Sequence, residues 1–216
     1  MASTRSAPAA ARGRRLRPEA RRQHILDAAR AVFSERPYTT VTTADVAGAA
    51  GVARSLVHHY FGGIGEVFVA VVAQGGAALS DVRTAGPETP FDERLARNIA
   101  ASLDVIADNR ETWLAVAGHG EALNDPRIRA LAEAAVQRSI ERTLAANPDV
   151  IGDTPVARHA LRCFNAFSAE ATRAWLTGEA SRAATETLLV TASRDLLLHT
   201  NPALERAAAS GGSRSG

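Results

Sequence analysis

The sequence predicts an all-α protein that consists of a small three-helix head followed by a longer helical body. Apolar residues recur at spacings of three and four over most of the chain, as they do along one face of an α-helix. The breaks in this pattern fall at glycine and proline, and no useful length of sequence alternates apolar and polar residues as a strand would. We therefore expect helices throughout, except at the two ends of the chain.

Four regions are expected along the chain. An N-terminal arm (1–17) and a C-terminal tail (207–216) are rich in small and polar residues without an apolar period, which is typical of disordered segments. Between them we expect the head (18–64) and the body (65–206). No apolar run approaches the roughly 20 residues that a membrane span needs. The single cysteine, Cys163, fits a reducing compartment, so we expect a cytoplasmic protein.

The head has the spacing of a helix-turn-helix. Its first helix begins at Pro18 and ends at Pro37. The apolar stripe of this helix contains Ile25, Leu26, Ala29, Val32 and Phe33. Thr42 is a suitable N-cap for the second helix, because Asp45 follows at nearly the pattern of a capping box. This helix stops at Gly51, where a positive φ suits a residue without a Cβ, and a third helix follows the tight turn.

The third helix is predicted to face outward. Ala47 lies where the second and third helices cross most closely, and a small core between them is supplied by Val46, Val52 and Val57. With Val57 pointing inward, Ser55 and His59 point almost directly away, because each residue turns the helix by about 100°. The flanks of the helix hold Leu56, His58 and Tyr60. Serine and histidine at the most outward positions are suited to base edges and phosphates.

The body is expected to contain six helices. Their predicted ranges are Glu66 to about Val82, Pro90–Asn109, Arg110 to about Leu123, Pro126–Ala146, Pro155–Thr177 and Ser181–His199.

Charge divides unevenly between head and body. Residues 1–64 hold ten arginines and four acids, a balance of +6, whereas the whole chain carries +2, so the remainder carries −4. A basic head on an acidic body is expected when one end of a protein meets a polyanion. The arginines of the arm either reach a DNA groove or belong to a solvated tail, and the sequence leaves both alternatives open.

The stretch "VTTADVAGAAGVARSLVHHYF" (41–61) resembles the N-terminal signature of the tetracycline-repressor (TetR) family of transcriptional regulators. The resemblance is strongest over residues 20–66, and "EATRAWLTGEASRAATETLL" (170–189) is more loosely similar to the dimerising segment of the family. It implies a homodimer joined through the last two long helices. It also implies that the heads bind an inverted-repeat operator in double-stranded DNA, and that a small-molecule effector in the body releases it.

The resemblance also assigns roles to residues of the head. It implies that Thr43, His58 and Tyr60 contact phosphates. His58 stands where the family usually has Tyr, Ala53 where it commonly has a capping Ser, and Ile64 where it often has a phosphate-binding Lys. The full set of expected DNA contacts is Thr42, Thr43, Arg54, Ser55, Leu56, His58, His59 and Tyr60.

An effector pocket is expected among aromatic residues of the body. We predict that it is lined by Trp113, Val116, His119 and Phe167, because aromatic walls with a few polar groups are typical of small-molecule cavities. The stripe formed by Phe164, Phe167 and Ala171 fits a dimer seam equally well. Cys163 is expected to be a buried small hydrophobe.

Other classes of function are disfavoured. Adjacent His58 and His59 diverge around the helix and have no third ligand at a suitable spacing, so we expect no metal site. The acids and histidines of the body form no nucleophile elbow or phosphate-binding loop, and "FGGIGE" follows a helix rather than a strand, so we expect no enzyme and no cofactor. The rival interpretation is a dimeric helical ligand-binding or scaffold protein that does not bind an operator. Activation rather than repression also stays open.

Overall fold

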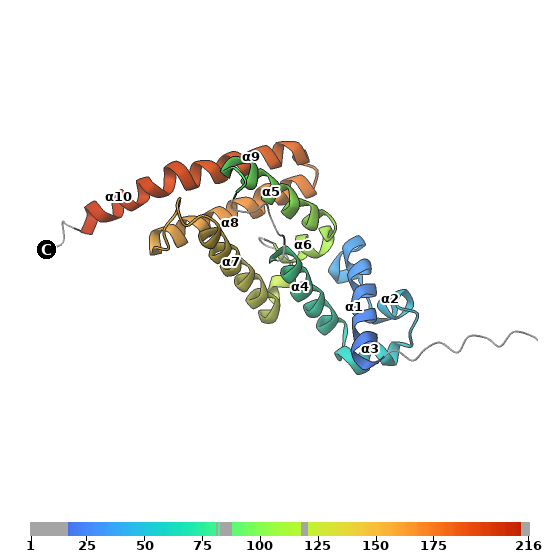
Figure 1. The fold of residues 1–216 in the computed structure, drawn as a ribbon. Coiled ribbons are helices and arrows are strands. Elements are labelled where there is room, and N and C mark those ends of the chain that lie inside the picture. The colour runs from blue at the N-terminus through green and yellow to red at the C-terminus, as the bar shows by residue number, and fades with distance from the viewer. Residues whose placement is uncertain (1–16, 81, 83–87, 118–120, 213–216) are drawn as a thin grey trace, which may run out of the picture.

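The computed structural model describes residues 17–80, 82, 88–117 and 121–212, which form helices joined by turns (Figure 1). The described ranges contain no strand, and the predicted all-α class is confirmed. In chain order the elements are α1 (Pro18–Glu35), the 3₁₀ helix η1 (Tyr38–Thr40), α2 (Thr43–Ala49), α3 (Arg54–Phe61), α4 (Ile64–Ser80), α5 (Phe91–Ala107), α6 (Arg110–Val116), the 3₁₀ helix η2 (Glu121–Asn124), α7 (Pro126–Ala146), α8 (Pro155–Leu176), α9 (Arg182–Asp195), a π-helical segment (Leu196–Thr200) and α10 (Asn201–Gly212).

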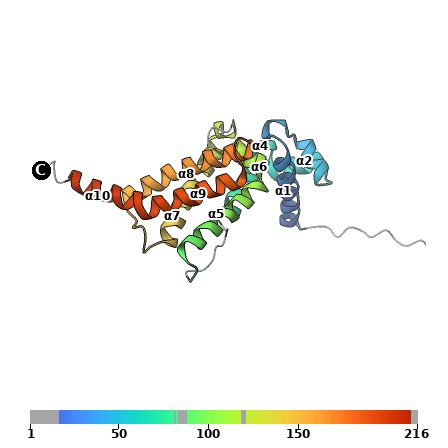
Figure 2. The same ribbon diagram turned by 90° about the horizontal axis from the view of Figure 1, so that it is seen from above.

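The molecule is elongated, with the head at one end and α10 at the other (Figures 1 and 2). The head consists of α1, α2 and α3, and α4 leads from it into the body. In the body, α4 and α7 run side by side in the same direction, since Glu66 pairs with Arg127 while the carbonyl of Leu79 accepts from Arg142. Helix α8 packs between α7 and α9, and α5 covers α9.

The core of the head continues into the body. Val46 and Val57, both fully buried, join α2 to α3. Phe33 of α1 meets Phe68 of α4 edge to face at 4.8 Å, and Tyr38 lies 4.1 Å from the same ring. The same cluster extends to residues of η2 and α7. The apolar core therefore contains residues on both sides of residue 64, the position at which we placed the end of the head.

A second core lies at the far end of the body. It is formed by Ile140, Leu144, Ile151, Ala157, Leu161 and Leu197. Between the two cores packing is looser: no residue is buried over 129–139 of α7, 162–171 of α8, or 73–79 of α4. The middle level of the body is thus only partly buried, although helices surround it.

Two sequence predictions about helix ends differ from the structure. The helix expected over Arg110 to Leu123 ends at Val116, and the sequence that follows, "GHG", has two glycines of low helix propensity. The tail expected to be disordered from residue 207 is helical as far as Gly212, because its alanines favour helix strongly. Residues 1–16 of the arm and 213–216 of the tail lie outside the described residues.

The prediction for the thiol was also wrong. Cys163 is exposed on α8, with its Sγ 3.8 Å from Nε2 of His159. It follows an exposed arginine on the outer face of the helix, whereas Leu161 occupies the inner face.

No single helix of the described part is long and apolar enough to cross a membrane. One bent pair, α3 with α4, meets the length and composition test across an angle of 63°.

Candidate nucleic-acid interface

The N-terminus of α2 is held by a capping box. The backbone N–H of Asp45 donates to Oγ1 of Thr42 at 3.3 Å, and the backbone N–H of Thr42 donates to Oδ2 of Asp45 at 2.8 Å. Arg36 of the preceding turn pairs with Asp45 at 2.9 Å. The hydrogen bonds from Thr42 and Arg36 hold the pKa of Asp45 well below its usual value.

The turn between α2 and α3 depends on glycine. Gly51 adopts a φ of +62°, in the left-handed region that side chains with a Cβ disfavour. The turn is closed by a hydrogen bond of 3.0 Å from the N–H of Val52 to the carbonyl of Ala47. His24 of α1 donates from Nε2 to the carbonyl of Ala50 at 2.9 Å, and so ties the first helix to this turn.

Helix α3 presents a polar outer face on an apolar base. Val57 is fully buried and Phe61 nearly so, while Leu56 and Tyr60 are half-buried against the same core. The residues fully exposed along the helix are Arg54, Ser55, His58 and His59. The predicted outward direction of Ser55 and His59 is therefore confirmed. The expectation that they read bases stays a prediction.

Two of the expected DNA contacts, Thr42 and Thr43, are less available than the sequence suggested. The hydroxyl of Thr42 donates to Oδ2 of Asp45 at 2.5 Å, so its one proton is already engaged. Thr43 is only 7% exposed, which leaves its side chain little access to a phosphate. The sequence pattern placed both residues at the start of α2 and could not show which way their hydroxyls turn.

The structure adds a cationic residue that the sequence analysis did not assign. The guanidinium of Arg22 in α1 lies 4.7 Å above the ring of Phe61, at the end of α3, and its side chain is exposed. His58 donates from Nδ1 to the carbonyl of Gly62 at 3.0 Å, which fixes its ring at the same end of the helix. Positive charge therefore lies at both ends of α3, because Arg54 is its first residue and Arg22 stacks on Phe61, its last. In the sequence, Arg22 stands three residues before Ile25 of the apolar stripe, and this spacing could have indicated that its side chain lies beside the core of the head.

The three predicted effector contacts within the described residues lie in different surroundings. Val116 packs against the core shared with the head, Trp113 is half-buried on α6, and Phe167 is 41% exposed on α8. His119 lies outside the described residues. Two open hollows of about 350 and 390 Å³ in the described surface involve none of these residues. The exposure of Phe167, whose ring lies 5.9 Å from that of Phe164, favours the dimer-seam interpretation.

The middle level of the body contains buried polar atoms without described hydrogen-bond partners. Oε1 of Gln74, Oδ1 of Asn98 and Oγ of Ser168 are buried and have no hydrogen-bond partner within the described residues. Such atoms are costly in a folded protein, and each needs an explanation. Uncharged polar residues on an amphipathic helix gave no sequence signal, because only packing shows which of them face inward.

The described residues contain no group of three or more His, Cys, Asp or Glu arranged to hold a metal ion.

Comparison with known proteins relates the head to one family of regulators. Residues 25–71 match the model for "Bacterial regulatory proteins, tetR family". The "HTH-type transcriptional regulator BetI" of Brucella anthropi is 34% identical over 113 residues, which are 50% of this chain and 58% of that protein. The BetI regulator of Brucella abortus is 32% identical over 49% of this chain and 56% of its own length. The chain thus spans little more than half the length of the curated relatives it matches.

The likeness to solved structures covers most of the chain. A tetR-family transcriptional regulator from Streptomyces coelicolor has a TM-score of 0.75 and 25% identity, covering 90% of both chains. A TetR-family regulator from Rhodococcus sp. has a TM-score of 0.67 over 82% of this chain and 98% of that one, with 18% identity, which supports the fold alone. The family model covers the helix-turn-helix, and the Streptomyces structure matches head and body together, so this chain shares its head with the bacterial tetR regulatory proteins and its fold with a tetR-family transcriptional regulator.

Proposed function

We propose that the protein is a homodimeric, sequence-specific DNA-binding repressor of the cytoplasm, released from an inverted-repeat operator by a small molecule. The observation that carries this proposal is the exposed face of α3, where Ser55 and His59 stand outward from a fully packed base. A helix of this kind fits the major groove, with short polar groups at the base edges. Two such helices in a dimer would enter successive grooves about 34 Å apart.

DNA binding is tested by selecting duplexes from a random-sequence pool and by a gel shift with the DNA upstream of the protein's own gene. His59→Ala and Ser55→Ala should each relax sequence preference by about 1–3 kcal/mol at one position of each half-site. Arg54→Ala and Arg22→Ala are the matched variants, because loss of a phosphate contact weakens all sequences alike and lowers the log–log salt slope by about 0.9. An unchanged preference in His59→Ala would show that α3 reads bases with another face.

The proposed dimer buries the outer faces of α8 and α9. Phe167 is 41% exposed and Leu188 is 47% exposed, and both are large apolar residues on the last two long helices. We expect Phe167→Glu and Leu188→Glu to give monomers in sedimentation equilibrium. Leu204→Glu is the control, since Leu204 is similarly exposed, at 39%, but lies on α10. If all three variants remain dimers, the seam lies elsewhere.

The effector is proposed to bind at the middle level of the body. Gln74, Asn98 and Ser168 lie on three different helices, and each is near buried positions of its own helix, Ser168 being one turn from buried Thr172. All three groups are uncharged. An uncharged molecule that carries hydrogen-bond donors on an apolar frame would satisfy these oxygens.

Operator release provides the test of this location. Small neutral, anionic and cationic compounds are screened for release of the selected duplex, and the active ones are retested on Gln74→Met and Asn98→Leu. We expect neutral compounds with hydroxyl or amide donors to act on the parent protein and to lose at least tenfold in potency on both variants. Retained potency on both would place the effector elsewhere while leaving DNA binding intact.

A further inference from the structure

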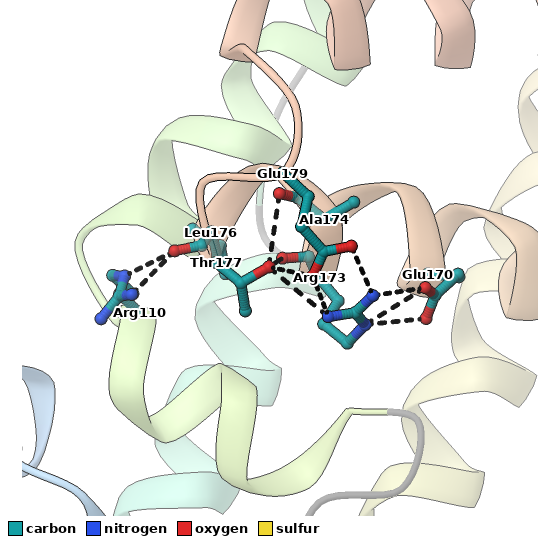
Figure 3. Close-up of polar contacts among 7 residues, drawn as sticks. All are labelled: Arg110, Glu170, Arg173, Ala174, Leu176, Thr177 and Glu179. Carbon is teal, nitrogen blue, oxygen red and sulfur yellow. Dashed lines mark hydrogen bonds and ion pairs between the residues drawn. The ribbon is translucent and has the colours of Figure 1, made fainter.

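Two arginines meet the carboxyl end of α8 in different ways (Figure 3). Arg173 belongs to α8 itself and binds groups of its own helix end. Its guanidinium pairs with Glu170 at 2.7 Å and with Glu179 at 2.8 Å, and its Nη1 lies 3.4 Å from Oγ1 of Thr177. The hydrogen bond from Arg173 lowers the pKa of Glu179. These contacts brace the end of α8 and the turn that follows it.

Arg110 reaches the same helix end from α6. Its Nε and Nη2 donate to the carbonyl of Leu176 at 3.1 and 2.7 Å, and its Nη1 pairs with the neighbouring Glu111. Leu176 is the last residue of α8, so its carbonyl has no partner within the helix. A guanidinium that donates twice to such a carbonyl satisfies it and also complements the negative end of the helix dipole.

Two residues further along, α6 makes the same kind of contact with the head. Thr112 is 6% exposed, and its Oγ1 donates to the carbonyl of Phe33 at 3.4 Å. Phe33 lies in the last turn of α1, where carbonyls again lack helical partners. Ala115 and Val116 pack against the core that contains Phe33. One short helix therefore holds the carboxyl ends of a head helix and of a body helix.

We infer that α6 couples the position of the head to the carboxyl end of α8, and that Arg110 is the positioning residue of this coupling. The inference rests on the proposed function, because it concerns how DNA binding at the head changes the helix assigned to the dimer seam. Helix α4 joins head and body through the chain, whereas α6 joins them through side chains, with Arg110 bonded to α8 and Thr112 bonded to α1. A displacement of α1 on DNA is transmitted to α6 through Thr112 and changes the bond between Arg110 and Leu176. By linkage, a change at α8 alters DNA affinity to the same extent.

The coupling is measured by hydrogen exchange on the full-length protein, with and without the duplex that the parent protein selects from a random pool. In the parent protein, DNA should change exchange rates over residues 176–181 by about fivefold or more. In Arg110→Met this DNA-dependent ratio should fall to one, while DNA still protects α1 and α3. Thr112→Val should give the same loss, because it breaks the bond between α6 and the head.

Arg173→Gln is the matched control. It removes an arginine from the same helix end and should raise exchange there in the free protein, yet it should keep the DNA-dependent ratio, because its partners do not lie on α6. A parent protein that binds its duplex without any change at 176–181, or an Arg110→Met variant that keeps the ratio, would overturn the inference and leave the proposed function standing. Failure to select any duplex would overturn both.

Discussion

The head and the middle of the body are packed in opposite ways. The head has an apolar core without gaps, in which Ile25, Val46 and Val57 are fully buried and an aromatic group links α1 to α4. The middle level of the body has helices on all sides but no buried residue over long stretches of α4, α7 and α8, and three buried polar atoms without described partners. Both regions are built from helices.

This contrast separates a rigid part from an adaptable one. A groove-reading helix must keep a fixed geometry, which dense packing provides. The middle level, where we propose that the effector binds, keeps buried polar atoms without described partners, at a cost in stability. The difference leads to four measurements, from the largest expected effect to the smallest.

Removal of a ring from the head core should have the largest effect. Phe68 is fully buried, with the rings of Phe33 and Tyr38 in contact, so Phe68→Ala should lower the free energy of unfolding by about 3–5 kcal/mol. Leu204→Ala, at a 39% exposed position, should change it by less than about 0.5 kcal/mol. Denaturant unfolding measures both. A loss below about 1 kcal/mol for Phe68→Ala would contradict the dense packing of the head.

Apolar substitutions at the middle level should stabilise the protein. Gln74→Met, Asn98→Leu and Ser168→Ala each remove a buried atom that lacks a described partner, and each should raise the free energy of unfolding by about 1 kcal/mol, seen as a rise in Tm of about 2–4 °C.

Asn165→Leu is the control for these three variants. Nδ2 of Asn165 donates to the carbonyl of Leu161 at 2.8 Å, so this substitution should lower Tm. If all four substitutions lower Tm equally, the buried polar atoms of the middle level are as well hydrogen-bonded as those of the head.

Two glycines of the helix-turn-helix should respond in opposite directions. Gly51→Ala imposes a Cβ on a φ of +62° and should cost about 1 kcal/mol, although no atom lies within 4 Å of the added carbon. Gly48→Ala, within α2 and equally free of neighbours, should gain about 0.5–1 kcal/mol from helix propensity. Thermal unfolding compares the two. Equal shifts would mean that the turn relaxes and is not rigid.

The smallest effect is expected in acid, where the head core meets α7. Asp125 caps α7, and the hydrogen bond from Arg127 lowers its pKa to about 2 from 3.8. Because the folded value is the lower one, ionised Asp125 stabilises the fold fully above pH 3.8, and this contribution is lost as the pH falls toward about 2. The difference in unfolding free energy between the parent and Asp125→Asn should be constant above about pH 5 and shrink below it. A difference independent of pH would exclude this ion pair.

Sequence reasoning was most accurate in the head. The capping box, the glycine turn and the outward direction of Ser55 and His59 follow from short-range rules that act within one or two turns of helix. It was less accurate where the answer depends on distant neighbours. Burial of Thr43 and exposure of Cys163 are set by which helices pack on each face.

The region that we propose for the effector was the hardest part to predict. We predicted the pocket at Trp113 and Phe167 because both are aromatic. Phe167 faces outward, however, and the buried oxygens without described partners at the middle level belong to Gln74, Asn98 and Ser168. The spacing of apolar residues shows which face of a helix is apolar. It does not show where the apolar faces of two helices do not pack against each other. The contacts of Arg110 and Thr112 were also missed, since they join residues that are 66 and 79 positions apart.

The exposed thiol of α8 offers a practical advantage. Cys163 is the only cysteine in the sequence, and its side chain is accessible on α8 close to Phe167 in the chain. A nitroxide spin label would therefore attach at one defined site per subunit without any engineered substitution. Pulsed electron resonance between two labelled subunits would then measure the separation of their α8 helices, with and without DNA.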